Sequence, residues 1–138
     1  MATTIQKLLE ATEVNEHTSE AQRADPITLA DETALAVTTT GSWVDVGEGR
    51  NLALALTISA VTGTSPTFNV TLETSSDKGV TDTPRALNSL ATAGAFAQQI
   101  AAGTVRKCFG PTDRYVRCVI TLGGGTPVGT IKVSGKVN

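Results

Sequence analysis

Few side chains in this sequence have the chemistry that catalysis needs. The chain of 138 residues has one histidine, His17, and two cysteines, Cys108 and Cys118. Acid–base and nucleophilic catalysis require convergent polar groups, most often including a histidine. His17 lies in the polar run NEHTSEAQRADP (15–26), away from any predicted core strand. We therefore expect no catalytic residues and no enzyme activity.

Metal, cofactor and phosphate sites are also not expected. The cysteines are ten positions apart, with no CxxC motif and no second histidine to complete a ligand set. The glycine triplet 123–125 is followed by Thr126-Pro127, whereas a phosphate-binding loop continues with Lys and Ser or Thr into a helix. A wide turn between two strands is the favoured interpretation of the triplet.

The two cysteines are placed symmetrically about Asp113, in the proline turn GPTDR (110–114). A hairpin centred on Asp113 would bring the two thiols face to face across antiparallel strands. Cysteine often acts as a small buried hydrophobe, and we expect core packing here. A redox role stays open, because nearby cations could lower a thiol pKa.

Four basic residues of the same region form a cationic cluster: Arg106, Lys107, Arg114 and Arg117. A solvated sheet face is one interpretation, and a docking patch for an acidic protein surface is the other. Direct nucleic-acid binding is not expected, because the chain has a formal net charge of −2 and few aromatic rings.

The elements that would position these residues are predicted to be strands. In 50–59, Leu52, Leu54, Leu56 and Ile58 alternate with small or polar residues, and 67–74 repeats the alternation with Phe68, Val70 and Leu72. Other predicted strands span 34–39, 42–46, 104–109, 114–122 and 129–137.

Turn signals at 62–66 and 75–79 are expected to separate strands. The looser segment 80–102 should supply one or two strands and a long loop, with a helical turn as an alternative for 86–93. Seven to nine short strands predict an all-β, antiparallel, jelly-roll-like β-sandwich over residues 27–138. GTSP (63–66) and GTP (125–127) also resemble each other, and two loops of similar chemistry explain this as well as a duplication does.

Residues 1–26 are predicted to form a separate N-terminal arm. Ile5, Leu8 and Leu9 recur at helical spacing, which indicates one short amphipathic helix followed by an extended segment. Either this arm is a loose terminus or its apolar stripe docks on a partner subunit. Residues 1–33 hold two basic and seven acidic side chains, a balance of −5, whereas the rest holds nine basic and six acidic, a balance of +3. This asymmetry favours head-to-tail contacts between copies.

The sequence has no run of about 20 apolar residues and no signal-peptide pattern, so we expect a protein made in a cytosol, with reduced cysteines and no membrane contact.

Several segments resemble a known family: GTSPTFNVTLETS (63–75), the polar turn SSDKG (75–79), and RYVR (114–117) followed by Gly-Thr-Pro. These segments are similar to small structural proteins of tailed bacteriophages, in particular head decoration (cement) proteins and minor virion components. The resemblance covers 61–133, with 42–59 matching loosely and residues 1–26 not at all.

The resemblance implies a non-enzymatic protein that binds the major capsid protein on the outside of the virion and stabilises the shell, commonly as a homotrimer. Such a protein would be assembled in the bacterial host cytoplasm. A tail or connector component, and a host- or glycan-binding module on the same sandwich, are the alternatives. The scarcity of Trp and Tyr counts against glycan binding.

Overall fold

The computed structural model describes residues 25–90 and 95–138, which form seven strands and no helix. The strands are β1 (Asp25–Leu35), β2 (Thr39–Thr40), β3 (Val44–Asp45), β4 (Leu52–Ser75), β5 (Arg85–Ala86), β6 (Gly103–Phe109) and β7 (Tyr115–Val137). All pairings are antiparallel. The prediction of an all-β antiparallel sandwich is confirmed. The predicted helix at Ile5, Leu8 and Leu9 lies outside the described residues.

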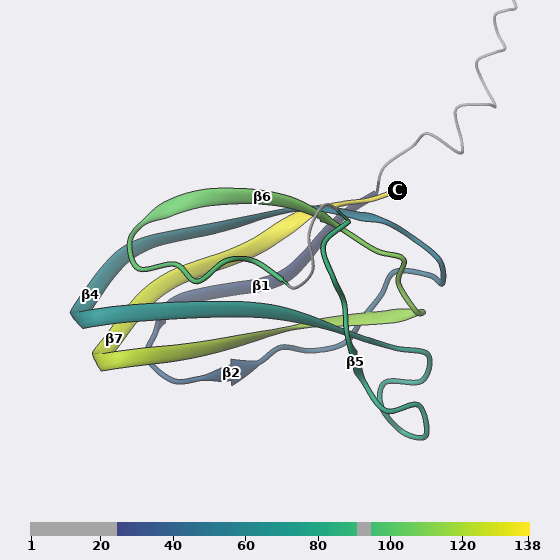
Figure 1. Cartoon of the computed structure of the whole chain (residues 1–138), viewed down its shortest axis with the longest axis horizontal. Helices are drawn as coiled ribbons and strands as arrows, with labels where there is room; N and C mark the ends of the chain where they lie inside the picture. Colours follow the sequence, from purple (N-terminus) through teal and green to yellow (C-terminus); the bar gives the residue numbers. More distant parts are fainter. Residues whose placement is uncertain (1–24, 91–94) are drawn as a thin grey trace, which may run out of the picture.

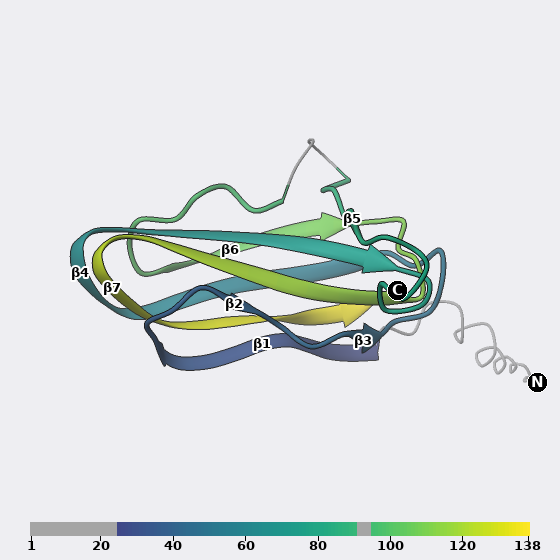
Figure 2. The same cartoon turned by 90° about the horizontal axis from the view of Figure 1, so that it is seen from below.

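Two long strands build most of the molecule. β4 has 24 residues and β7 has 23, and they pair along their whole length, from Leu52 opposite Val137 to Ser75 opposite Tyr115. Both strands bend sharply at the same end of the molecule (left in Figures 1 and 2), where the register shifts. The paired ribbon therefore folds back on itself and makes two layers.

Each layer is completed by shorter strands. In the first, here the β1–β6 layer, β1 pairs with the last part of β7 and β6 pairs with the first part of β4. In the second, here the β2–β5 layer, β2 and β3 pair with the first part of β7, and β5 pairs with the last part of β4. The pairing of the short strands fixes which outward side chains become neighbours.

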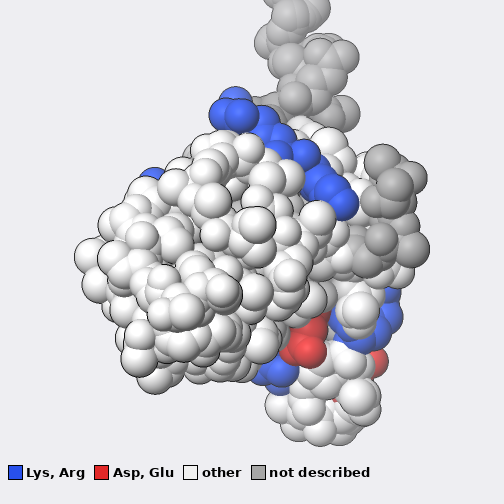
Figure 3. Space-filling view, turned by 60° about the vertical axis from the view of Figure 1, so that its left-hand side comes forward, with Lys and Arg blue, Asp and Glu red and all other residues white. Residues whose placement is uncertain are grey.

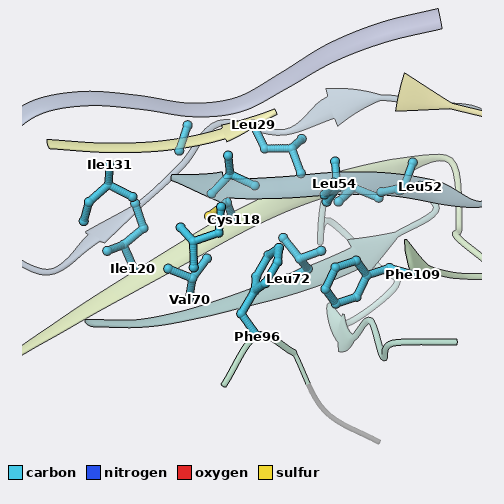
Figure 4. Packing of buried hydrophobic residues seen from close by; sticks show 14 of the residues in the cluster. Leu29, Leu52, Leu54, Val70, Leu72, Phe96, Phe109, Cys118, Ile120 and Ile131 are labelled. Atoms are coloured by element: carbon cyan, nitrogen blue, oxygen red, sulfur yellow. The ribbon is translucent and has the colours of Figure 1, made fainter. Parts of the chain in front are cut away.

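The core lies between the layers, and the predicted inward faces are correct. Leu52, Leu54, Leu56 and Ile58 face Phe68, Val70 and Leu72 across it, all at most 2% exposed. Ile120, Ile131 and Cys118 fill the space between them (Figure 4). Phe96, from the loop before β6, packs edge-on against Phe109 with ring centroids 5.1 Å apart. Leucine and phenylalanine side chains each contribute about 2 kcal/mol when fully buried, so this cluster dominates the stability.

Two predicted turns are wrong: 62–66 and the glycine triplet 123–125 lie inside β4 and β7 and form the bends. Glycine and proline signals are the same for a turn and for a bend. Here the strands continue because each bend pairs with the other, with Thr64 opposite Gly125. The GTSP and GTP segments are therefore neighbours in space.

Smaller corrections concern the short elements. The predicted strand 34–39 is interrupted at 36–38, between β1 and β2. Residues 86–90 form the end of β5 and an isolated bridge, Ser89 opposite Phe109, rather than a helical turn, and 91–94 lie outside the described residues. Residues 25–90 and 95–138 contain seven strands, the lower limit of the predicted number, but two of them are far longer than expected.

Candidate functional site

The four predicted cationic residues do not form one cluster. Arg106 and Lys107 lie on β6, which pairs with β4, whereas Arg117 lies on β7 and Arg114 immediately precedes it. The predicted hairpin between 104–109 and 114–122 is therefore wrong. Symmetric spacing about Asp113 is a local signal, but the partner of β6 is decided by the first part of β4, far away in the sequence.

The segment between β6 and β7 crosses from one layer to the other. Thr112, only 2% exposed, anchors this crossing. Its hydroxyl donates to the Gly47 carbonyl at 2.9 Å and accepts from the Arg50 amide at 3.1 Å. Because 110–114 is bonded to the 47–50 loop in this way, it does not close a hairpin.

The cysteines consequently lie in different layers and environments. Cys118 is 1% exposed, and burial, aided by the negative charge of Glu32, raises the pKa of its thiol to about 12. Core packing is thus confirmed for Cys118. Cys108 is exposed and stands opposite Ala53 on the outer face of the β1–β6 layer, so core packing is wrong for this residue.

Arg117 and Arg114 are engaged on the outer face of the β2–β5 layer. Arg117 pairs with Glu73, directly opposite on β4, at 2.8 Å, and its guanidinium lies 4.4 Å from the ring centroid of Trp43. Arg114 pairs with Asp45 at 3.0 Å, and this hydrogen bond lowers the pKa of the Asp45 carboxyl. These cations are neutralised within the chain, as expected for a solvated sheet face.

Arg106 and Lys107 behave differently from each other. Lys107 bonds through Nζ to the Ala95 carbonyl at 3.2 Å. Arg106 lies on the outer face of the β1–β6 layer, in a row with Ala55 and Ser134, beside the row formed by Cys108, Ala53 and Lys136. None of the ion pairs among the described residues involves Arg106 or Lys136.

These two rows form the floor and rim of a groove of about 820 Å³. The floor consists of small side chains, Ala53, Ala55 and Ser134, and the rim carries Arg106 and Lys136. Leu90, 52% exposed, stands at the edge next to β6, where its amide bonds to the Cys108 carbonyl at 2.8 Å. We call this surface the outer groove. The sequence signal for it was the outward series of small residues at 53, 55 and 57, together with Ser134 and Lys136 at alternate positions.

A second surface was missed by the sequence reasoning: an end of the molecule without charge. Four segments meet at the bends, namely 34–40, 60–67, 99–103 and 121–130, and none contains Lys, Arg, Asp or Glu. With this end turned forward, Figure 3 shows a large face without charged side chains, and Lys, Arg, Asp and Glu appear only at its upper and lower margins. Val37 and Ile100 are 67% and 68% exposed there. We call this surface the uncharged end.

The acidic loop after β4 has a structural role. Asp77 accepts hydrogen bonds from the amides of Val80, Thr81 and Asp82. Bonds from the hydroxyl and amide of Thr81 lower its pKa to about 2. In the described part of the chain, no three His, Cys, Asp or Glu side chains gather as a metal site requires. His17 lies outside it.

No protein-family model, curated protein or solved structure matches this chain. The described residues also contain no helix with the length and apolarity of a membrane span. The two surfaces above are therefore the basis on which a function is proposed.

Proposed function

We propose that this chain is a non-enzymatic structural protein of a bacteriophage virion, a decoration protein that binds the outside of the capsid and stabilises the shell. The observation that carries the proposal is the uncharged end. The surface of a protein in solution normally mixes charges of both signs, whereas the core of a protein–protein interface is depleted of charge. A charge-free end with two exposed aliphatic side chains therefore suits docking on another protein.

The construction of this end supports a structural role. It is built from the bends of β4 and β7, and these strands stay paired up to and beyond the bends. A paired ribbon is already ordered and therefore loses little conformational entropy on binding. A small contact area can then be enough for stable binding. Many copies on one shell, here proposed as homotrimers, would add avidity to each contact.

Glycan binding is less well supported than protein docking. The rings of Trp43 and Tyr115 each have a guanidinium over one face, from Arg117 and from Arg114. Lys78 also lies 5.0 Å from the ring centroid of Tyr115. Rings covered by cations are poor platforms for stacking a sugar.

The first test is mass spectrometry of the purified virions of the phage that encodes the chain. We expect a copy number comparable to that of the major capsid protein. Absence from the particle would overturn the proposal, and a few copies per particle would favour a tail or connector role instead.

The second test identifies the docking surface on capsids that lack this protein. Val37→Glu combined with Ile100→Glu should reduce cosedimentation at least about tenfold, since each substitution buries an unpaired charge in the contact. Val80→Glu is the matched control, because Val80 is 80% exposed in the loop at the opposite end. Equal loss with Val80→Glu, or no loss with the double variant, would contradict docking through the uncharged end.

A further inference from the structure

The chemistry of the outer groove matches that of a segment of the same chain. Its floor of Ala53, Ala55 and Ser134 leaves room for larger aliphatic side chains, and its rim is cationic. No lining residue is acidic. The groove therefore suits a segment that has an aliphatic stripe followed by carboxylates.

Residues 1–24 have this composition. Ile5, Leu8 and Leu9 form the aliphatic stripe, and glutamates follow at positions 10, 13, 16 and 20. Between Lys7 and Arg23 there is no lysine or arginine, so the charged groups that follow the stripe are the four glutamates.

The entry point of this segment lies close to the groove. Asp25 pairs with Val137, and the next residues of β7 and β4, Lys136 and Ala53, are opposite each other in the groove. With neighbouring strands about 4.8 Å apart, Ala53 lies about 10 Å from β1 across the sheet. The sixteen residue steps from Leu9 to Asp25 can span up to about 55 Å, so reach does not limit the contact.

We propose that residues 5–13 of the chain occupy the outer groove of their own subunit, with Ile5, Leu8 and Leu9 on the alanine floor and Glu10 and Glu13 beside Arg106 and Lys136. A tethered segment has an effective concentration in the millimolar range, whereas a second copy competes only at its solution concentration. The contact is therefore intramolecular in dilute solution. This inference is independent of the virion role proposed above.

Cys108 provides the readout, since it lines the groove and belongs to the exposed residues of the described part of the chain. An occupied groove protects this thiol from a neutral alkylating reagent such as N-ethylmaleimide. Cys118 is the internal reference, because its buried thiol stays unreactive in the folded protein. A Cys108→Ser variant establishes that background rate.

The decisive variant of the full chain is Leu8→Asp combined with Leu9→Asp. If the groove is occupied nine-tenths of the time, emptying it raises the labelling rate of Cys108 about tenfold. Gln6→Asp with Ala11→Asp is the matched control, because it adds the same charge outside the aliphatic stripe. This control should label within about twofold of the unmodified chain. Far-UV circular dichroism verifies that each variant is folded.

A charge exchange tests the orientation. Lys136→Glu should accelerate labelling, and adding Glu10→Lys with Glu13→Lys should restore protection. Labelling equally fast in the unmodified chain and the Leu8/Leu9 variant would overturn the proposal. Protection that grows with protein concentration would overturn the intramolecular contact and identify a second copy as the occupant.

Discussion

The two ends of this sandwich are built in different ways. At the uncharged end, the bends of β4 and β7 lie against each other and are held by backbone pairing between small residues. At the opposite end, backbone hydrogen bonds such as Gly49 to Thr112 at 2.7 Å join the loops at 46–51 and 110–114, and ion pairs add to them. Arg85 of β5 pairs with Asp113 at 3.2 Å, and Arg114 pairs with Asp45 of β3 at 3.0 Å. These loops are held by ion pairs and side-chain hydrogen bonds in addition to backbone bonds, whereas the continuous strand pair is ordered by its ladder alone.

The bends show what replaces side-chain partners. GTSP (63–66) and GGTP (124–127) have the same pattern of positive φ angles: Gly63 and Gly124 share it, and so do Ser65 and Thr126. A Cβ on Gly63 would meet the Thr126 carbonyl, and a Cβ on Gly124 would meet the Ser65 carbonyl. The two bends interlock reciprocally, so their stability depends on glycine rather than on charge.

The largest expected effect is therefore at a bend. In Gly63→Ala the new methyl group would lie 2.7 Å from the Thr126 oxygen, in a residue with φ near +114°. We expect a loss of about 3 kcal/mol in the free energy of unfolding, from backbone strain and displacement of the facing bend. Urea denaturation followed by circular dichroism measures it.

Gly49→Ala is the matched variant at the opposite end. Gly49 has φ near +72°, but a Cβ added to it would meet no atom within 4 Å. The only expected loss in the free energy of unfolding is the cost of placing alanine in a left-handed backbone conformation, about 1 kcal/mol. If both variants lose the same free energy, close packing of the two bends is not what holds the uncharged end.

The sequence predicted the faces of the strands better than their neighbours. Leu52 to Ile58 and Phe68 to Leu72 were assigned to the core correctly, because an alternation of period two lies within one segment. The pairing of β6 with β4 joins residues about 50 positions apart, such as Cys108 and Ala53. No local spacing carries that information, and this is why the cysteines were wrongly placed face to face.

The surfaces likewise divide into local features and long-range ones. The outward alanines of β4 follow from alternation within one segment, but the meeting of four uncharged segments depends on where the paired strands bend. The repeated Gly-Thr and proline signals were visible in the sequence. That the two segments pair with each other, rather than close two separate loops, could not be read from these signals.

The second prediction removes a buried anchor at the loop end. In Thr112→Val the side-chain shape is kept, but the hydroxyl bonds to the Gly47 carbonyl and the Arg50 amide are lost. Leaving these backbone groups without partners should cost about 2 kcal/mol. Thr104→Val is the control, since this hydroxyl is exposed and contacts only the Thr57 hydroxyl, and its change should stay within about 0.5 kcal/mol. Similar losses in both would mean that the crossing is not fixed through Thr112.

The third prediction concerns pH and the loop after β4. The hydrogen bonds of Thr81 hold the folded pKa of Asp77 at about 2, below its ordinary value of 3.8. The unfolded chain therefore takes up the proton first as pH falls, and the stability from this carboxylate, complete above pH 4, is lost towards pH 2. The melting-temperature difference between the unmodified chain and Asp77→Asn should narrow over this range. Parallel pH profiles would show that the carboxylate charge does not order the loop.

The smallest effect is expected for the ion pair of Arg117 with Glu73. Its side chains are 26% and 32% exposed, so solvent screens much of the attraction. A double-mutant cycle with Arg117→Met and Glu73→Gln should give a coupling of about 0.5 kcal/mol, reduced further in 1 M salt. The uncharged end would then depend on single glycines, whereas each of the ion pairs Arg85–Asp113, Arg114–Asp45 and Arg117–Glu73 would be dispensable on its own. A coupling above about 2 kcal/mol would remove this contrast, because one pair would match the effect of a bend.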